Sequence, residues 1–446
     1  MADDDRLESL FDRLRGDTDT EIPTSAFGRL RRMAGTALRT ARAARKGGGP
    51  GQGFGAADLA AVERMVVSLG ELKGIAMKMG QILSYIDADM PAETRRLLSL
   101  LQVHSQPTPF EQVTAIIRED VPAEADAIIA SLDPIPVASA SIGQVHRGVL
   151  PDGTEVAVKV RHPGIDDAIR ADFRAASVGK VMAALMAPGA SIKDTIAEAQ
   201  ARFLEECDYA LEATRQRRFA EIFAADERIA VPAVHDAWCG QRVLTTTWHD
   251  GVSYDAWLDS DPSAEERAAV GRALYDFYVG TLYRHGIFNA DPHPGNLLFM
   301  PDGRVTVLDY GCVRAFDGAT VRALAALSQA VRDDVAPAIR DAMVGLGARD
   351  PGDSGKRFDA TRGLLRAFFG PVMEPGRHVI TADVSIDFKQ SYQTKRAIFR
   401  LRVPGKLLFL YRIRFGLYAV LARIRADNDW RAIETRLTDA VLSPSA

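Results

Sequence analysis

The sequence predicts an α+β protein of two lobes that follow an N-terminal helical extension. Two strand hairpins, each closed by an Asp-Gly turn, are expected at residues 145–161 and 297–308. Apolar residues recur at three- and four-residue intervals through much of the remaining chain, which is typical of helices. Helical spacing prevails after residue 263, so we expect a small strand-rich lobe followed by a larger helical lobe.

The composition is that of a globular protein. The 446 residues include 55 Lys and Arg against 59 Asp and Glu, a net charge of −4, and 47% are hydrophobic. These values exclude a disordered chain and a uniformly basic nucleic-acid binder, so no nucleic-acid partner is expected, and they leave the oligomeric state open. Cys207, Cys239 and Cys312 lack metal-ligand spacing, so they predict neither a disulfide framework nor a zinc site and indicate a reducing compartment.

Residues 1–55 are expected to form a flexible leader, acidic up to residue 25 and basic over 29–46. The basic arm is either a solvated tail or a segment attracted to anionic lipid headgroups. The acidic opening is unlike an export signal, and no apolar run reaches the roughly 18 residues that a membrane-spanning helix needs. We therefore expect a cytoplasmic protein, or one peripheral to the inner face of a membrane.

Three further units are expected, a helical extension at 56–108, a smaller lobe at 109–247 and a helical lobe at 248–446. The smaller lobe should contain a helix at 111–131, the first hairpin, helices over 165–223 and strand-like runs at 229–234 and 242–247. Within the helical lobe, residues 407–422 are apolar but contain Arg412 and Arg414, which argues against a membrane-spanning helix. We expect a buried helix there, with a partly exposed amphipathic helix as the alternative.

Polar residues with a recognisable order flank the second hairpin. Asp291 and Asn296 precede its first strand, and Asp309-Tyr310-Gly311 follows its second strand. This order is the layout of the C-lobe of protein kinases, in which the first Asp orients the nucleophile and the Asn and second Asp bind Mg²⁺. The pattern therefore predicts an ATP site, with Asp291 as catalytic base and Asn296 and Asp309 as ligands of Mg²⁺.

The first hairpin carries the matching nucleotide-binding residues. Lys159 ends a Val-Ala-Val-Lys strand, as does the kinase lysine that contacts the α- and β-phosphates. We choose Glu198 as its acidic partner. The loop before the hairpin is rich in small residues, whose backbone amides can approach phosphates. Its expected nucleotide contacts are Ala138, Ser139, Ala140, Ser141, Gly143 and Gln144, and adenine is expected to contact the backbone of Thr246 and Trp248.

Four motifs together give a resemblance to the AarF/UbiB family of atypical kinase-like proteins, which are tied to ubiquinone biosynthesis and lipid homeostasis. They are Lys78-Met79-Gly80-Gln81, Ser141-Ile142-Gly143-Gln144-Val145-His146, Glu206-Cys207-Asp208-Tyr209, and the Asp291 to Asn296 segment with Asp309-Tyr310-Gly311. The resemblance covers residues 57–320 and continues more loosely to about residue 430.

The resemblance implies a kinase-like fold in which Lys78, Gln81, Glu206 and Asp208 form a regulatory plug over the active site. It implies an ATPase, or a kinase of a small lipid-like or quinone-precursor acceptor. A catalytically weak regulatory scaffold and a Ser/Thr protein kinase are the alternatives. For the plug itself, the alternative is that Lys78 is a surface lysine and Glu206 pairs with Arg202.

Overall fold

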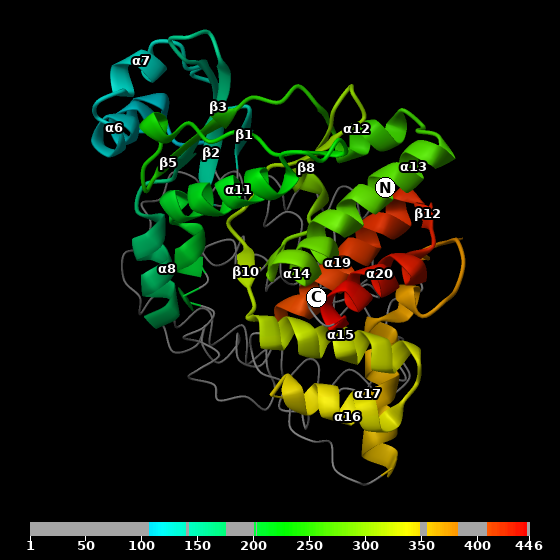
Figure 1. Cartoon of the computed structure of the whole chain (residues 1–446). Coiled ribbons are helices and arrows are strands. Elements are labelled where there is room, and N and C mark those ends of the chain that lie inside the picture. Colours follow the sequence, from blue (N-terminus) through cyan, green and yellow to red (C-terminus); the bar gives the residue numbers. More distant parts are fainter. Residues whose placement is uncertain are drawn as a thin grey trace, which may run out of the picture.

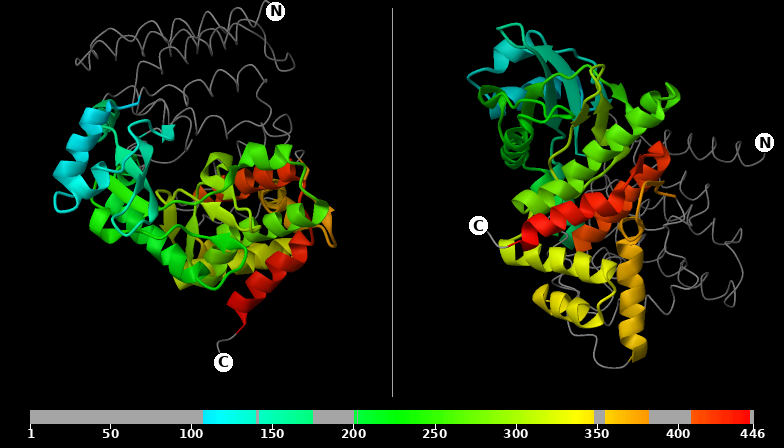
Figure 2. Two further views of the ribbon diagram at one scale, coloured as in Figure 1. Left: turned by 90° about the horizontal axis from the view of Figure 1, so that it is seen from above. Right: turned by 45° about the vertical axis from the view of Figure 1, so that its right-hand side comes forward.

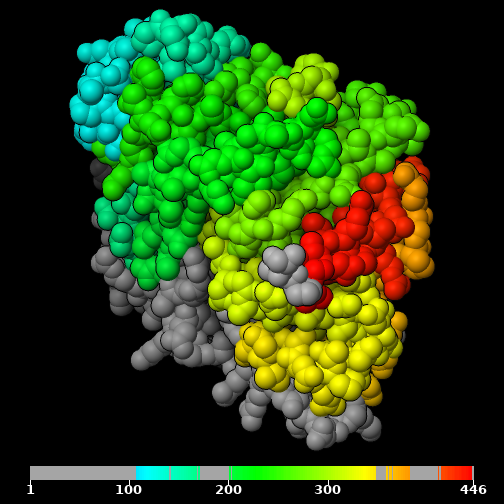
Figure 3. Space-filling model, viewed as in Figure 1, coloured from blue at the N-terminus to red at the C-terminus, as the bar shows by residue number. Residues whose placement is uncertain are grey.

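The computed structural model of the chain describes residues 107–139, 142–174, 200–201, 203–347, 355–381 and 408–443. The leader and nearly all of the helical extension lie outside these residues, as do Lys78, Gln81, Ala140, Ser141 and Glu198. The described chain folds into a smaller strand-rich lobe and a larger helical lobe (Figures 1 and 2). A space-filling view shows the smaller lobe, in cyan and green, at one end of the molecule and α16 (Ala336–Gly345), in yellow, at the other (Figure 3).

The smaller lobe is built on an antiparallel four-stranded sheet of order β1-β2-β3-β5. Its strands are β1 (Ala138–Ser139), β2 (Gly143–Val149), β3 (Glu155–Arg161) and β5 (Val243–Thr247). The expected hairpin is confirmed, because β2 pairs with β3 along their full length and Gly153 adopts a positive φ of 87° in the turn. Glycine reaches such a φ without the steric cost that other residues incur.

Helices α6 (Phe110–Asp120) and α7 (Ala125–Ile129) pack on one face of this sheet. A single helix was expected over 111–131, but Pro122 follows the end of α6, and proline disfavours helical geometry in the residue before it. Val156, Val158 and Val160 point into this core, with at most 1% of their surfaces exposed. Because strand side chains alternate between faces, Lys159 points to the opposite face.

Helix α11 (Tyr209–Phe223) runs between the small sheet and the larger lobe (Figure 1). Its inner stripe repeats at helical spacing and contributes Phe219 and Phe223 to the core of the larger lobe. Helix α8 (Ile165–Arg174) follows β3. The strand-like run expected at 229–234 is only the short strand β4 (Ile229–Ala230), which pairs with β9 (Val305–Val307) of the larger lobe.

The larger lobe is mainly helical and surrounds one apolar core. Its second sheet has the order β4-β9-β8-β6, and the hairpin expected at 297–308 is confirmed within it as β8 (Leu297–Phe299) and β9 (Val305–Val307). The other strands are β6 (Val252–Ser253), β7 (Ile287–Asn289), β10 (Val313–Ala315), β11 (His378–Val379) and β12 (Asp427–Asn428). The remaining helices are α12 (Tyr254–Asp259), α13 (Ala264–Tyr275), α14 (Thr281–His285), α15 (Gly318–Arg332), α17 (Gly355–Phe368), α19 (Leu408–Ile424) and α20 (Trp430–Leu442), with a π-helical segment at Asp276–Gly280 and 3-10 turns at Asp236–Trp238, Pro294–Asn296 and Gly370–Val372.

Helix α19 is the apolar segment expected at 407–422, and the prediction of a buried helix is confirmed. Leu417 and Leu421 are fully buried, and Arg414 is 4% exposed because it pairs with the buried Glu434 of α20. Among the described residues, no helix combines the length and apolar character that crossing a bilayer would require.

Candidate active site

Lys159 of β3 forms a buried ion pair with Glu212 of α11. Its Nζ lies 3.0 Å from each carboxylate oxygen of Glu212, and their side chains are 16% and 2% exposed. Burial alone would lower the pKa of Lys159, but the negative charges of Glu212 and Asp309 outweigh burial and raise it. Lys159 is therefore held as a cation directed away from the apolar core of its sheet.

Among the described residues, the acid that pairs with Lys159 is Glu212, rather than the Glu198 chosen from the sequence. Glu198 itself lies outside the described residues. The sequence contained one signal for the correct partner. Tyr209, Glu212, Ala213, Gln216 and Phe219 form the buried stripe of α11, so Glu212 is an acid at a position where helical spacing calls for an apolar side chain.

Asp309 also lies near Lys159, with Oδ2 4.0 Å from Nζ. It begins a turn in which its Oδ1 accepts a hydrogen bond from the amide of Gly311 at 2.8 Å. The side chain of Asn289 donates to the carbonyl of Asp309 at 2.7 Å, a contact that the sequence analysis did not identify. Tyr310 is fully buried and packs on Phe219 of α11, so the turn is anchored to the same helix as Glu212.

Asn296 and Asp309 lie at the same end of the β8–β9 hairpin. Asn296 immediately precedes β8, and its carbonyl accepts a hydrogen bond from the amide of Leu308 at 2.9 Å. Its side-chain amide donates to Oδ2 of Asp291 at 3.4 Å, so the two predicted catalytic-loop residues are in contact. Nδ1 of His293 accepts a hydrogen bond from the amide of Gly295 at 2.9 Å, which helps to hold the loop.

The chemistry of these donors fits Mg²⁺. An Asn carbonyl oxygen and an Asp carboxylate are hard ligands, and Mg²⁺ in nucleotide sites takes one or two protein oxygens together with phosphate and water. The described residues contain no group of three or more His, Cys, Asp or Glu side chains that could hold a metal by themselves. Asn296 and Asp309 could therefore form a Mg²⁺ site whose remaining ligands come from a bound phosphate and water.

A sequence profile of the ABC1 atypical kinase-like domain matches residues 100–341, more than half of the chain. The chain belongs to this family. The match includes Lys159, Glu212, Asp291, Asn296 and Asp309, and it confirms both the kinase-like fold and the resemblance to AarF/UbiB proteins.

Several known proteins are similar to this member of the ABC1 family. The mitochondrial atypical kinase COQ8B of Rattus norvegicus is 31% identical over 319 residues, which cover 69% of this chain and 60% of that protein. The chloroplastic protein ACTIVITY OF BC1 COMPLEX KINASE 3 of Arabidopsis thaliana is 34% identical over 189 residues, or 42% of this chain and 27% of that protein. The alignments thus span less than two thirds of these relatives. The solved structure of Rv3197 from Mycobacterium tuberculosis, in complex with erythromycin, is 29% identical with a TM-score of 0.60, covering 86% of this chain and 97% of that one.

The small-residue loop of this ABC1 domain is described on both sides of Ala140 and Ser141. Ala138 and Ser139 are exposed and pair with Val145 and Gln144 across the loop. Gly143 is tightly enclosed, because a Cβ there would lie 2.4 Å from the Tyr209 hydroxyl and 2.5 Å from the Val160 carbonyl. This glycine is therefore required by packing as well as by any phosphate contact.

The side chain of Gln144 is buried within the smaller lobe. It is 1% exposed, and its amide bonds both the N–H and the carbonyl of Thr108, at 2.6 and 3.1 Å. It also donates to Nε2 of His146 at 2.8 Å, while Nδ1 of His146 donates to the Asp133 carbonyl. Gln144 thus fixes the chain that enters the lobe.

Of the two predicted adenine contacts, Thr246 lies in β5 and Trp248 directly follows it. Thr246 is paired with Ala157 of β3 on one side and forms a bridge to Val234 on the other. The amide of Trp248 donates to the carbonyl of Glu155 at 2.8 Å, so it is not a donor for adenine. The strand-like run expected at 242–247 is confirmed as β5, and the hydrogen bond of Trp248 continues its pairing with β3 by one residue.

The E-x-D motif of the family lies where one helix stops and the next begins. Helical backbone ends at Glu206, and Asp208 caps α11 by accepting a hydrogen bond from the amide of Leu211 at 3.1 Å. One helix therefore ends and another begins between the two acids. Glu206 is 8% exposed and lies beside Gly311, so the motif adjoins the Asp309 turn.

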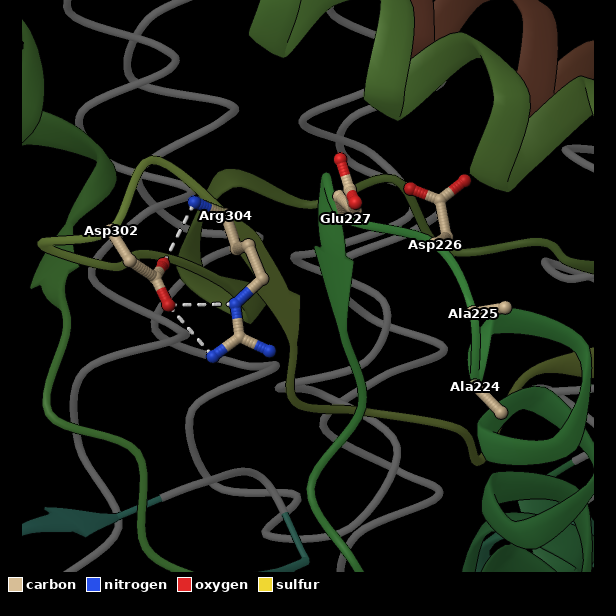
Figure 4. A pocket seen from close by; sticks show the side chains of 6 residues that line it. All are labelled: Ala224, Ala225, Asp226, Glu227, Asp302 and Arg304. Carbon is tan, nitrogen blue, oxygen red and sulfur yellow. Dashed lines mark hydrogen bonds and ion pairs between the residues drawn. The ribbon is translucent and has the colours of Figure 1, made fainter.

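A surface groove of about 480 Å³ lies apart from these residues, at the C-terminal end of α11 (Figure 4). Its lining residues are Ala224, Ala225, Asp226, Glu227, Asp302 and Arg304. Asp302 and Arg304 are paired at 2.7 Å across the turn of the β8–β9 hairpin. Because none of the predicted nucleotide-binding or metal-binding residues line the groove, it is not the candidate active site.

Proposed function

We propose that this chain binds Mg-ATP and hydrolyses it, or transfers its γ-phosphoryl group to a small non-protein acceptor. The observation that supports this most strongly is the position of Lys159. Its Nζ is paired with Glu212 and lies 4.0 Å from Asp309, at the end of the hairpin that also presents Asn296. One cation and a set of hard oxygen ligands are thus available to a triphosphate at one place.

Each residue would have a separate task. Lys159 would contact the α- and β-phosphates, and Asn296 and Asp309 would hold Mg²⁺, which supplies positive charge to the phosphate oxygens. Asp291 is 9% exposed and would orient the attacking hydroxyl or water and accept its proton. The contact between Asn296 and Asp291 would keep the base and the metal ligand in a fixed relation.

The acceptor is proposed to be a lipid or a quinone precursor, reached by peripheral contact with a membrane. Support comes from the family and from the K-x-G-Q motif, whose Lys78 and Gln81 share one helix face in the expected extension. A plug of this kind would obstruct a polypeptide substrate. The plug and the acceptor are tested together by measuring turnover with and without anionic vesicles that contain a quinone-precursor mimic.

The decisive experiment measures Mg²⁺-dependent phosphate release by the full chain and by Asp309→Asn and Asp291→Asn. We expect each substitution to reduce turnover about 100-fold or more. Asp302→Asn is the matched control, because Asp302 lies at the far turn of the same hairpin and is half exposed. Unchanged turnover in Asp309→Asn would overturn the site. Nucleotide binding without turnover in the parent chain would instead favour a regulatory scaffold.

A further inference from the structure

Arg215 joins the turn that carries the proposed metal ligand Asp309 to the segment that precedes the E-x-D motif. It lies on α11, three residues after Glu212 and on the same helix face. One nitrogen of its guanidinium donates to the carbonyl of Gly311 at 2.7 Å, and another donates to Oε2 of Glu205 at 2.9 Å. The Arg215 side chain is 16% exposed, so these charge-assisted bonds are largely shielded from water.

The hydrogen bond from Arg215 restrains the backbone conformation at Gly311. The amide of Gly311 is held by Oδ1 of Asp309 at 2.8 Å, and its carbonyl is held by Arg215. A glycine rotates more freely about its two backbone bonds than any other residue. Hydrogen bonds to the peptide groups on both sides of Gly311 therefore fix the conformation that aims the Asp309 carboxylate.

The other end of the link is Glu205, directly before the E-x-D motif. Its Oε2 also accepts a hydrogen bond from Arg314 of β10 at 3.1 Å, and Arg314 is 7% exposed. Two arginines that lie before and after the Asp309 turn in the chain thus share one carboxylate. The segment that carries Glu206 is joined in this way to the turn that carries the proposed metal ligand.

We propose that Arg215 is a positioning residue that holds Asp309 in its metal-binding orientation and couples that orientation to the E-x-D segment. This inference rests on the proposed function of Asp309. Without Arg215, the turn would populate several orientations, and Mg²⁺ would bind only the fraction that is correctly aimed. The affinity for Mg²⁺ should therefore fall, while nucleotide binding in the absence of metal should be retained.

The test is a Mg²⁺ titration of the full chain with ADP, with the thermal unfolding midpoint as the readout. In Arg215→Met, we expect the Mg²⁺ concentration for half-maximal stabilisation to rise about tenfold or more, as for other partners of metal ligands. Metal-free ADP binding should change less than about twofold. Arg218→Met is the matched control, because Arg218 lies on the same helix in an exposed pair with Glu221. We expect it to behave as the parent chain.

Two further variants test the two hydrogen bonds of Arg215, to Gly311 and to Glu205. They keep the proposal open to refutation if Arg215→Met does not fold. Arg215→Lys can replace only one of the two donors at a time, so its Mg²⁺ midpoint should lie between those of the parent and Arg215→Met. Glu205→Gln removes the charge that orients Arg215 and should also raise the midpoint. The proposal would be overturned if the Mg²⁺ concentration for half-maximal stabilisation were unchanged in Arg215→Met, or unchanged in both Arg215→Lys and Glu205→Gln.

The same titration separates this proposal from the proposed function. If the parent chain shows no Mg²⁺-dependent stabilisation by ADP, or if Asp309→Asn retains it in full, the proposed function fails. If parent and Asp309→Asn differ as expected but Arg215→Met titrates like the parent, only the positioning role fails.

Discussion

Glu212 holds Lys159 through both of its carboxylate oxygens, each 3.0 Å from Nζ, although the residues are 53 positions apart in the chain. The pair joins α11 to β3 at a place where water is nearly excluded. The Tyr209 ring lies 4.9 Å from the same Nζ and further encloses it. Removing either charge would leave the other buried without its partner, which costs far more than losing an exposed pair.

We therefore expect Glu212→Gln to lower the free energy of unfolding by about 3 kcal/mol. ATP turnover should also fall, because Lys159 would no longer be held in place for the phosphates. Urea denaturation and phosphate release measure the two effects. Glu221→Gln on the same helix is the control, since Glu221 is 65% exposed in a surface pair, and its effect should stay within about 0.5 kcal/mol. Equal stability of the two variants would contradict the importance of the buried pair.

The start of β2 gives a second prediction. Gly143→Ala should destabilise the smaller lobe and disturb the small-residue loop, because its Cβ would meet the Tyr209 hydroxyl at 2.4 Å and the Val160 carbonyl at 2.5 Å. The carbonyl belongs to the neighbouring strand and cannot move without breaking the sheet. We expect a loss of at least about 2 kcal/mol, measured by urea denaturation.

Gly148→Ala, in the same strand, is the matched control for Gly143→Ala. The nearest atom to its added Cβ is the Leu132 methyl carbon at 3.2 Å, the end of a side chain that can shift. This variant should lose clearly less stability. If the two alanine variants were equally stable, the enclosure of Gly143 would not explain why glycine occurs there.

The sequence predicted those parts of the fold that depend on neighbouring residues. Both hairpins have Asp-Gly turns between alternating strands, and both were confirmed. The sequence also predicted the family, because its motifs are short continuous segments.

The sequence could not predict contacts set by tertiary packing. A glutamate on an apolar stripe, such as Glu212, indicates a buried partner but does not identify which residue that partner is. Trp248 was expected to bind adenine, but whether its amide is free depends on how far β5 pairs with Glu155. Arg215 gave no local signal, since its partner Gly311 lies 96 positions away.

A third prediction concerns pH. Burial lowers the pKa of His146 below its ordinary value of 6.5, although the hydrogen bond to the Asp133 carbonyl opposes this shift. Nε2 faces the amide nitrogen of Gln144, whose orientation is fixed because its oxygen accepts from the Thr108 amide. If Nε2 of His146 were protonated, its N–H and the N–H of Gln144 would face each other, and neither could accept a hydrogen bond.

The sign of the effect follows from proton uptake. Below about pH 6.5, the unfolded chain binds a proton at His146 that the folded chain resists, so stability falls as the pH drops. Between pH 7.5 and 5.5, the loss from this residue is at most about 1.4 kcal/mol. His146→Asn keeps a donor for the Asp133 carbonyl but does not titrate, so urea denaturation should show a smaller loss over this range. An identical pH dependence in the two proteins would refute the assignment.

The fourth prediction concerns the ion pair of Arg414 and Glu434, which joins α19 to α20 inside the larger lobe. Glu434 is fully buried and accepts hydrogen bonds from Tyr275 at 2.5 Å and Tyr283 at 2.9 Å as well as from Arg414. Arg414→Met should lower the free energy of unfolding by about 3–5 kcal/mol, because the carboxylate would remain buried without its cation.

The double variant Arg414→Met/Glu434→Leu separates the cost of an unpaired charge from the value of the pair. Removing both charges should recover much of the stability lost in Arg414→Met, since apolar residues of similar size often replace a buried pair at little cost. Arg423→Met is the surface control on the same helix, because Arg423 is 58% exposed in its pair with Asp255. Urea denaturation of the three variants measures these differences. If the double variant were less stable than Arg414→Met, the hydrogen bonds of Glu434 to Tyr275 and Tyr283 would contribute more than its charge costs, and the predicted order would be wrong.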